Sequence, residues 1–449
     1  MPRPLVIIHG WSDNYKSFQT LAAAVSQRRG VAVNVIALAD YISMNDFVTF
    51  GDLVAAMDKA WTDFGLPRTP ATVDAIVHST GGLVIRDWLV TTFKTNPAPI
   101  KNLVMLAPAN FGSPLAHKGR SFLGRVAKGF TNDQGMFQTG TYILKGLELA
   151  SPYSWDLAER DRLAPGTTIY GKKRVLCTVL VGNHGYDGIR AIANEDGSDG
   201  TVRSSTANLN CVALDVDFTA DPQKPTARWR APNGPTAFGV VDGHNHATIT
   251  LNESTLRNQA DKDLLDQIIA ALDVDDAGFD AWCTKLDKQT ADAMAAGAKS
   301  SATQGFQNTV VRVIDQDDHP VTDYLIEFYE EDDDRDLIAK LFHTTALADV
   351  HAYGADPSYR SLFINCTKLT KMVDKIDEAL SISITAHPVI PSEAPVGFRM
   401  FRNDDAGAVK IKEPDIPKFF QPNRTVLVTI RIRREREDKV FRIKAAGSP

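Results

Sequence analysis

The sequence has little cysteine and no long apolar run. Its 449 residues include four cysteines, which are scattered and fit no metal-ligand spacing: Cys177, Cys211, Cys283 and Cys366. Because Cys177 and Cys211 lie in apolar, strand-like segments, we expect buried free thiols and no bound metal. No apolar segment approaches the about 20 residues that a membrane-spanning helix requires, so the sequence predicts none.

An excess of basic charge is also lacking. The formal net charge is −6, which argues against nucleic acid as the main partner, because phosphate binding requires a concentrated basic surface. A hydrophobic content of 43% and a charged content of 23% are typical of a globular protein. The chain is long enough for two domains or slightly more.

A signal peptide is the third absence. A core-like strand, Leu5–Ile8, begins almost at Met1, where a secretory leader would carry basic residues and then an apolar stretch. We therefore expect a cytoplasmic protein. Export by a route without a signal, or a leader lost from this chain, stays an open alternative.

The stretch from Val73 to Trp88 carries the most specific pattern in the chain. An apolar, β-branched run, Val73–Val77, predicts a buried strand, and a helical spacing follows it at Leu83, Val84, Trp88 and Leu89. Between them lies a tight turn with Ser79 at its apex. Gly81 would let the helix approach the strand closely. The N-terminus of the helix would offer backbone N–H groups to a developing oxyanion beside Ser79.

This strand–turn–helix pattern resembles the nucleophile elbow of the α/β-hydrolase superfamily, and within it the bacterial lipases and the GPI-inositol-deacylase-like serine hydrolases. Val77 stands where the family's G-x-S-x-G motif has its first glycine. The resemblance covers residues 1–275 and implies that Ser79 is the nucleophile. It also implies an oxyanion hole formed by the N–H groups of Thr80 and Trp11, with Ser12 as the alternative to Trp11.

The acid of a triad is expected in a loop after the strand at 174–182. The segment Asp199-Gly-Thr-Val, followed by Ser204 and Ser205, resembles the D-G-x-V-x-x-x-S segment of lipases. The aspartate of that segment orients the catalytic histidine. Asp196, in a neighbouring Asp-Gly turn, is the alternative.

The base is expected on the loop after the last predicted strand, Phe238–Val241. His246-Ala-Thr-Ile resembles the corresponding family segment, so His246 is chosen and His244 is the alternative. The order Ser79, Asp199, His246 is the order of the triad in the superfamily.

Apolar strands alternate with helical patterns through the first half of the chain. Strands are predicted at residues 5–8, 31–38, 73–77, 102–107 and 174–182. The alternation predicts an α/β domain with a mostly parallel sheet and helices on both faces, and the resemblance implies an α/β-hydrolase fold for residues 1–275. A strand at 210–218 and a Pro-rich loop at 222–235 are assigned to the same domain.

An acyl pocket is expected above the carboxyl ends of these strands. The loop Ala107–Ala116 resembles the P-x-x-G-S-P loop of lipases, which forms a wall of that pocket, and Phe111 is its candidate residue. Residues 112–165 show helix-like apolar spacing and no strand pattern, which predicts a lid or cap insertion with Phe122 and Leu144 as further pocket residues. The alternative is a helical excursion that completes the core.

The pattern of hydrophobic residues changes near a small-residue segment, Ala295–Gly305. Residues 276–304 are predicted as a helical linker, and residues 305–449, where the period becomes two, as an antiparallel β-sandwich. The acidic run Glu330–Asp334 is expected to be a solvated loop, because it lacks the spacing of an EF-hand Ca²⁺ site.

Together these features predict a lipase or esterase. It would cleave carboxylic esters with an apolar acyl chain through a Ser-Asp-His triad and an acyl-enzyme, and it would need no metal or organic cofactor. The expected partners are a lipid or small ester substrate and, transiently, a lipid surface. A phospholipase-type activity, an acyltransferase, and a lipase effector whose β-sandwich serves binding or delivery stay open as alternatives.

Overall fold

The computed structural model describes most of the chain as two compact units. The first comprises Met1–Cys211, Ala231–Phe306 and Asn423–Thr425, and the second comprises Val212–Arg230, Gln307–Pro422 and Val426–Pro449. The described residues are 3–9, 18–38, 46–94, 96–116, 140–188, 191, 194–252, 256, 258–296, 304–329, 342–373, 379–386, 399–401, 407–412 and 415–436.

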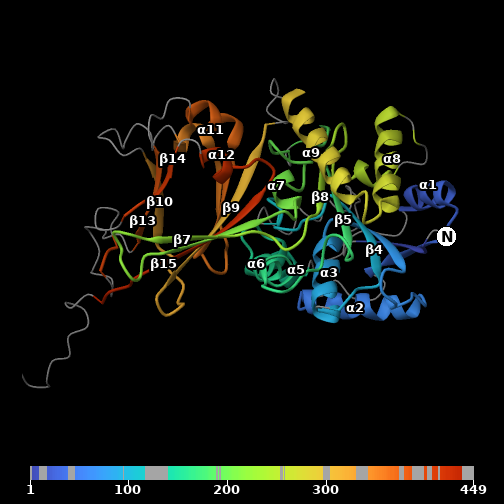
Figure 1. Ribbon diagram of the computed structural model, residues 1–449, viewed down its shortest axis with the longest axis horizontal. Helices are drawn as coiled ribbons and strands as arrows, with labels where there is room; N and C mark the ends of the chain where they lie inside the picture. The colour runs from blue at the N-terminus through green and yellow to red at the C-terminus, as the bar shows by residue number, and fades with distance from the viewer. Residues whose placement is uncertain are drawn as a thin grey trace, which may run out of the picture. The chain divides into compact units, whose positions relative to one another are not determined.

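The first unit is built on a six-stranded parallel sheet (Figure 1). The strand order is β2-β1-β3-β4-β5-β8, and each neighbouring pair is parallel. The strands are β1 (Leu5–His9), β2 (Val33–Ala37), β3 (Val73–His78), β4 (Ile100–Leu106), β5 (Leu176–Gly182) and β8 (Ala237–Val241). Every residue of β3 and of β5 is buried, as expected for strands that helices cover on both faces.

Helices cover both faces of this sheet. In Figure 1, α1, α8 and α9 lie on one side of it, and α2 and α3 lie on the other. The helices of this unit are α1 (Gln19–Arg29), α2 (Phe50–Asp63), α3 (Gly81–Trp88), α5 (Thr141–Leu147), α6 (Pro152–Ala158), α7 (Ser204–Ala207), α8 (Gln259–Asp273) and α9 (Phe279–Ala296), with π-helical turns η3 (Leu89–Phe93) and η4 (Glu159–Leu163) and a 3-10 turn η6 (Thr248–Thr250).

Helix α2 begins with a local capping motif. The side chain of Thr49 accepts a hydrogen bond from the backbone of Asp52, and the Asp52 carboxylate accepts one from the backbone of Thr49. This reciprocal pair is a capping box, which satisfies N–H groups that the first turn of α2 leaves without partners.

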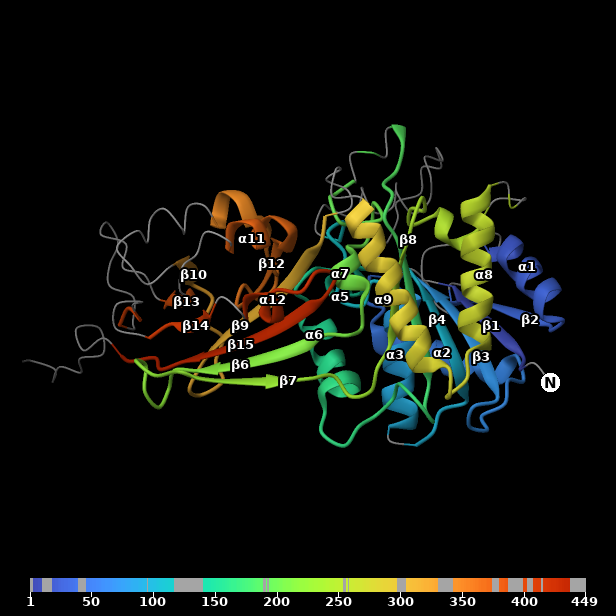
Figure 2. The same ribbon diagram turned by 45° about the horizontal axis from the view of Figure 1, so that its top comes forward.

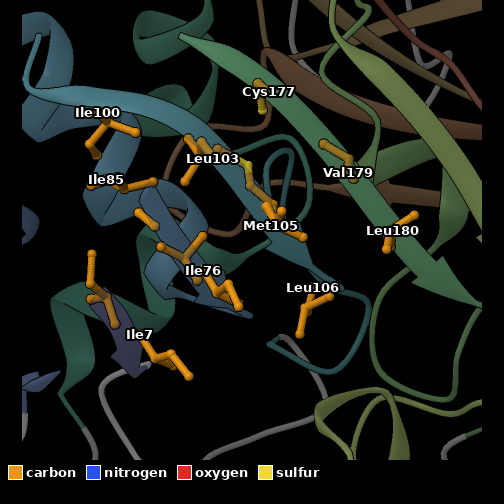
Figure 3. Close-up of a cluster of buried hydrophobic side chains, with 14 of the residues drawn as sticks. Ile7, Ile76, Ile85, Ile100, Leu103, Met105, Leu106, Cys177, Val179 and Leu180 are labelled. Atoms are coloured by element: carbon orange, nitrogen blue, oxygen red, sulfur yellow. The ribbon is translucent and has the colours of Figure 1, made fainter. Parts of the chain in front are cut away.

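The core of the first unit lies between the sheet and its helices. Figure 3 shows Ile7 of β1, Ile76 of β3 and Leu103 of β4 in one apolar cluster with Ile85 of α3. All four side chains are fully buried. The apolar face of α3, the helix that follows Ser79, therefore packs on the strands that precede and follow it.

The α/β-hydrolase fold predicted for the first half of the chain is therefore what the structure shows there, with one difference in extent. Residues 276–304 are not only a linker, because Phe279, Trp282 and Leu286 of α9 belong to the core of the first unit. The indole N–H of Trp282 also donates to the hydroxyl of Thr178 in β5, at 2.9 Å. The amphipathic face of α9 is thus used to cover the sheet.

The second unit contains two β-sheets that share one apolar core. One is six-stranded, in the order β11-β12-β9-β15-β6-β7, and the other is three-stranded, in the order β10-β13-β14. Its elements are β6 (Val212–Asp217), β7 (Thr226–Arg230), β9 (Phe306–Asp315), β10 (Tyr324–Tyr329), η9 (Phe342–Ala346), β11 (Leu347–Ala352), β12 (Tyr359–Asn365), α11 (Cys366–Val373), β13 (Ala379–Ala386), β14 (Val409–Lys412), α12 (Ile416–Phe419) and β15 (Thr425–Ile432).

Side chains from both sheets meet in the core of this sandwich. Val313 of β9 and Ile430 of β15 come from the larger sheet, and Phe328 of β10 and Ile384 of β13 come from the smaller one. All four are at most 6% exposed. The alternation of apolar residues that predicted a sandwich from residue 305 onward arises because one face of each strand points into this layer.

Two expectations about this unit are wrong. The sandwich is not purely antiparallel, because β15 pairs in parallel with β6, Val426 lying opposite Val212. The sandwich also does not begin at residue 305, because the hairpin of β6 and β7 at 212–230 forms one edge of its larger sheet, beside β15 in Figure 2. The supposed loop at 222–235 contains β7.

Two further observations concern features named from the sequence. The acidic run Glu330–Asp334 lies outside the described residues. In the part of the chain that the structure describes, no helix combines the length and the hydropathy needed for a segment that crosses a bilayer.

Candidate active site

Ser79 occupies a strained turn between β3 and α3. Its φ is +53°, in the left-handed region that residues with a side chain rarely adopt. Its N–H donates to the carbonyl of Leu106, at the end of the neighbouring strand β4, at 3.2 Å. The residue is half-buried. Strain of this kind persists only where the surroundings enforce it, and it is characteristic of functional turns.

A glycine allows the helix after Ser79 to lie against the next loop. A Cβ atom placed on Gly82 would lie 2.6 Å from Cβ of Pro108, closer than real side chains approach. Sequence reasoning singled out Gly81 for a close approach, whereas the structure places the close approach at Gly82. Any larger residue there would push the elbow helix away from the loop 107–116.

His246 lies on the turn that follows β8, where the sequence places it. Its Nε2 atom lies 3.0 Å from Oγ of Ser79. Asn245 shapes the turn, because its side-chain oxygen accepts hydrogen bonds from the N–H groups of Ala247 and Thr248, at 3.0 and 2.9 Å. This local cap starts the 3-10 turn η6 and holds the imidazole toward the serine.

Asp199 completes a hydrogen-bonded chain of three side chains. Its Oδ2 atom lies 2.9 Å from Nδ1 of His246, and its Oδ1 accepts hydrogen bonds from the N–H groups of Thr201 and Val202, at 2.9 and 2.7 Å. Asp199 is fully buried. With Nδ1–H donating to the carboxylate, Nε2 is left to accept the Ser79 proton, which is the tautomer a general base requires.

The structure separates the chosen residues from their alternatives. Asp196 is exposed on the loop that holds Asp199. His244 is 1% exposed, but neither of its ring nitrogens has a hydrogen-bond partner, and its Nε2 lies 4.0 Å from the carboxylate of Asp261. The structure thus brings Ser79, Asp199 and His246 together and leaves Asp196 and His244 outside that hydrogen-bonded chain.

His78 is a site residue that the sequence reasoning did not single out. Its Nε2 lies 3.0 Å from the carbonyl oxygen of His246, and the two imidazole rings are 4.7 Å apart, tilted by 44°. His78 ends β3 and directly precedes the serine, so the elbow strand itself holds the backbone of the histidine turn. The only sequence signal was its position beside Ser79.

Of the two predicted backbone donors of the oxyanion hole, the structure describes only that of Thr80. Thr80 has helical dihedral angles and precedes the first residue of α3, so its N–H belongs to the end of the helix where donors lack intrahelical partners. Trp11 and its alternative Ser12 lie outside the described residues. The role of Trp11 stays a prediction.

The structure describes two of the three predicted pocket residues, Phe111 and Leu144. Phe111 is 1% exposed, and the guanidinium of Arg86 lies over its ring, 5.5 Å from the centroid. Leu144 is half-buried on α5, and Phe122 lies outside the described residues. Of the predicted insertion at 112–165, the described part from residue 140 onward is helical. The pocket role of these residues stays a prediction.

A buried ion pair supports the wall that carries Phe111. Arg86 of α3 donates to both oxygens of Asp161, at 2.8 and 3.0 Å, and to the carbonyl of Asn110, at 2.8 Å. Both partners are fully buried. Burial opposes ionisation of Arg86, but Asp161 more than compensates, so the pKa of the guanidinium is raised. The guanidinium of Arg86, which always carries its positive charge, thereby links α3 to the loop 107–116.

Two of the cysteines are buried free thiols in the first unit, as expected. Burial raises the pKa of Cys177 to about 12 and that of Cys211 to about 11. Both thiols therefore stay protonated at neutral pH, which makes them poor nucleophiles and poor metal ligands.

Among the described residues, one cluster has the composition of a metal site. It consists of Asp315, Asp317 and His319 in the second unit. The guanidinium of Arg434 forms an ion pair with Asp315, and the backbone N–H groups of Asp317 and His319 both donate to the same carboxylate, at 2.9 Å. These donors already satisfy the charge that a cation would neutralise, so the cluster is a closed turn rather than an open metal site.

The fold and this site together define a chain with the α/β-hydrolase architecture and a hydrogen-bonded Ser-His-Asp arrangement at its elbow. Comparison with known proteins agrees. Residues 4–123 match the model of a family described as palmitoyl protein thioesterase. A search of curated proteins finds no match.

Two solved structures resemble the chain over nearly its whole length. Phospholipase PlaB from Legionella pneumophila is 24% identical, with a TM-score of 0.79, and 99% of this chain and 97% of that chain are covered. The same phospholipase in complex with thio-NAD gives a TM-score of 0.78 at the same identity and coverage. Likeness at this identity shows a shared fold.

A third structure resembles only part of the chain. The Bacillus licheniformis lipase BlEst2 in mature form is 16% identical, over 56% of this chain and 86% of that chain, with a TM-score of 0.33. This likeness is too weak to support an argument about this protein.

Proposed function

We propose that the protein is a serine hydrolase that cleaves carboxylic esters of lipid-like substrates. The single observation that carries the proposal is the hydrogen-bonded chain from Ser79 through His246 to Asp199, with distances of 3.0 and 2.9 Å, on a serine whose φ is +53°. Three side chains that are far apart in the sequence meet in the geometry that this chemistry requires.

The mechanism follows from the direction of these hydrogen bonds. Nε2 of His246 takes the proton of Ser79 Oγ as the oxygen attacks the ester carbonyl carbon. The tetrahedral oxyanion accepts hydrogen bonds from the N–H of Thr80 and, by the resemblance, of Trp11, each donor contributing about 3 kcal/mol to the transition state. His246 then gives its proton to the leaving alcohol, and the acyl group stays on Ser79.

Hydrolysis of the acyl-enzyme reverses these roles. His246 takes a proton from water, the resulting hydroxide attacks the acyl carbon, and Ser79 leaves with the proton. Asp199 keeps its negative charge throughout, orients the imidazole and stabilises the imidazolium in both steps. Because the Asp199 carboxylate already accepts two backbone N–H groups, it is held in place before substrate binds.

The comparisons favour an apolar acyl group. The matched family is named for palmitoyl groups, and the similar solved structure is a phospholipase. An ester of a lipid with a medium or long acyl chain is therefore the proposed substrate class, and contact with a lipid surface would accompany its binding. Ile143 and Leu147 of α5 are packed in the core of the first unit, so this part of the predicted lid segment favours the alternative of a helical excursion that completes the core.

A phospholipid substrate is the second candidate. It is favoured by the likeness to a phospholipase over 99% of this chain, which extends through the β-sandwich as well as the hydrolase unit. The chemistry at Ser79 would be the same, because the bond that joins an acyl chain to the glycerol of a phospholipid is also a carboxylic ester.

The test is a pair of measurements on the full chain. A fluorophosphonate probe should label Ser79, and Ser79→Ala should abolish labelling. Values of kcat/KM for p-nitrophenyl esters of two to sixteen carbons should rise over several carbons, since each buried methylene adds up to about 0.8 kcal/mol of binding. His246→Ala should remove activity, and His244→Ala is its matched control.

Three results would overturn parts of this proposal. Labelling that survives Ser79→Ala would exclude Ser79 as the nucleophile. Full activity in His246→Ala, with loss in His244→Ala, would exclude His246 as the general base. A maximum at acetate with a steep fall by butyrate would exclude lipid-like substrates in favour of a short-chain esterase. Release of fatty acid from phospholipid vesicles would separate the second candidate from the first.

A further inference from the structure

The backbone of His246 is held on both sides by the other two segments of the proposed triad. Its N–H donates to the carbonyl oxygen of Asp199, at 3.0 Å. Its carbonyl oxygen lies 3.0 Å from Nε2 of His78, the residue directly before Ser79. These two contacts run alongside the side-chain contacts of His246 with Asp199 and Ser79. The three segments are therefore joined twice, once through the reacting side chains and once through the backbone of the base.

The contact made by His78 has a defined direction. A carbonyl oxygen can only accept a hydrogen bond, so Nε2 of His78 must carry a proton and donate it. That nitrogen is directed at the backbone of His246, whereas the Ser79 hydroxyl is hydrogen-bonded to the ring of His246. His78 therefore serves as a donor to the turn of the base and leaves the proton of Ser79 to His246.

Aromatic packing holds the ring of His78 in place. The residue is 7% exposed. Its ring centroid lies 5.8 Å from that of Phe18, with the rings tilted by 59°, and 4.7 Å from that of His246, with a tilt of 44°. A buried side chain whose rotamer is fixed by packing offers its hydrogen bond without a further loss of conformational freedom. The donor is thus in place before any substrate binds.

The contact measures the position of the base from the elbow itself. His78 and Ser79 are neighbours in the chain, and the strained turn at Ser79, with a φ of +53°, fixes where both side chains start. A shift of the histidine turn away from the elbow would lengthen two contacts together, that of His78 with the carbonyl of His246 and that of the His246 ring with Ser79. Because hydrogen bonds weaken steeply beyond their ordinary length, the first contact opposes the shift that would break the second.

We propose that His78 is a positioning residue for the general base. It donates from Nε2 to the carbonyl of His246 and so fixes the distance between the imidazole of His246 and the hydroxyl of Ser79. It moves no proton in the reaction. The inference rests on the proposed function, because it takes Ser79 as the nucleophile and His246 as the base.

Two substitutions separate donation from packing. His78→Phe keeps an aromatic ring against Phe18 and removes the donor, whereas His78→Gln keeps an N–H near the place of Nε2 and gives up the ring. Because a misplacement of about 1 Å costs about a hundredfold in rate, kcat for a p-nitrophenyl ester should fall about a hundredfold in His78→Phe and at most about fivefold in His78→Gln.

Other readouts distinguish this role from a general loss of structure. His246 acts in both acylation and deacylation, so both steps slow alike, and KM should stay within about twofold of wild type. The rate at which a fluorophosphonate labels Ser79 should fall in the same order as kcat, because labelling needs the same base. The midpoint of urea unfolding should show that each variant is folded.

His184→Phe is the matched control. His184 follows β5, its side chain is exposed, and its backbone N–H donates to the carbonyl of His244 at 3.0 Å. The substitution therefore makes the same chemical change beside the same turn without removing a side-chain donor to it. It should leave kcat, KM and the labelling rate at their wild-type values.

Three outcomes would overturn the inference alone, in a wild-type chain that is labelled and active. One is a wild-type kcat in His78→Phe. Another is an equal loss in His78→Phe and His78→Gln, which would make packing, not donation, the cause. A third is a raised KM at unchanged kcat, which would place His78 in substrate binding. A wild-type chain that is neither labelled nor active would overturn the proposed function and this inference with it.

A further variant keeps the test decisive if His78→Phe does not fold. His78→Asn carries an amide on a side chain one carbon shorter than that of glutamine, so its N–H stops short of the carbonyl of His246. It should lose activity where His78→Gln retains it. Equal activity of these two variants would overturn the inference.

Discussion

Replacement of Gly182 by alanine should displace the histidine turn from the serine. Gly182 is the last residue of β5, and a Cβ atom built on it would lie 2.0 Å from the carbonyl oxygen of His244 and 2.7 Å from its carbonyl carbon. Real Cβ atoms do not approach other atoms within 3.0 Å, so the backbone at His244 must move by about 1 Å. His246, two residues later, moves with it.

The size of the effect follows from the hydrogen bond that this movement stretches. Nε2 of His246 lies 3.0 Å from Oγ of Ser79, which is already an ordinary hydrogen-bond distance, so a further 1 Å breaks it. A misplacement of about 1 Å in a reacting group costs about a hundredfold in rate. We therefore expect kcat for a p-nitrophenyl ester to fall about a hundredfold in Gly182→Ala, equivalent to about 2.7 kcal/mol of activation free energy.

The assay needs a control for the added methyl group. Gly51→Ala serves, because Gly51 lies in α2 and a Cβ there meets only Oγ1 of Thr49, at an ordinary 3.5 Å. Gly51→Ala should keep full activity and gain slightly in stability, since alanine favours a helix by about 1 kcal/mol. The rate of fluorophosphonate labelling at Ser79 should fall in Gly182→Ala alone. A folded Gly182→Ala variant with wild-type kcat and labelling rate would refute the reasoning.

Three further predictions concern single groups. Asp199→Asn should lower kcat by about 10⁴ with little change in KM, because the amide favours the wrong tautomer of His246; a loss below tenfold in a stopped-flow ester assay would contradict this. Asp161→Asn should leave Arg86 unpaired and lower the free energy of urea unfolding by about 3–5 kcal/mol; an unchanged midpoint would show that the pair is dispensable. Burial raises the pKa of Cys177 from 9.0 to about 12, so the unfolded chain loses this proton first and stability falls as pH rises above 9.0; Cys177→Ala should lose stability less steeply between pH 8 and 10 than wild type, and equal slopes would exclude the thiol as a cause.

The sequence by itself determined the elements whose physical cause is local. The run Val73–Val77 is apolar except for Asp74, because β3 is buried on both faces, and the helix spacing after it is visible without a structure. A serine between them can only be at the apex of the turn. The chain order of serine, aspartate and histidine was equally readable, because each followed a predicted strand whose carboxyl end lies at the same edge of a parallel sheet.

The tertiary structure decided every question that depends on distant partners. Asp196 and Asp199 share one loop, and His244 and His246 share another, so local pattern cannot tell which pair meets the serine. The distances of 2.9 and 3.0 Å settle which residues lie together, and they arise from contacts such as that of Gly182 with the carbonyl of His244.

The same limit explains the errors in domain assignment. A strand was predicted at 210–218, but one of its two hydrogen-bonding partners is β15, a segment more than two hundred residues later, and the register of Val212 with Val426 is not encoded near either one. The segment 276–304 was predicted as a helical linker, and its own residues did not reveal that α9 (Phe279–Ala296) would pack on the core of the first unit. A strand or helix is specified by its own residues, whereas its neighbour is specified only when the whole chain has packed, because burial and hydrogen bonding between strands are properties of pairs of segments.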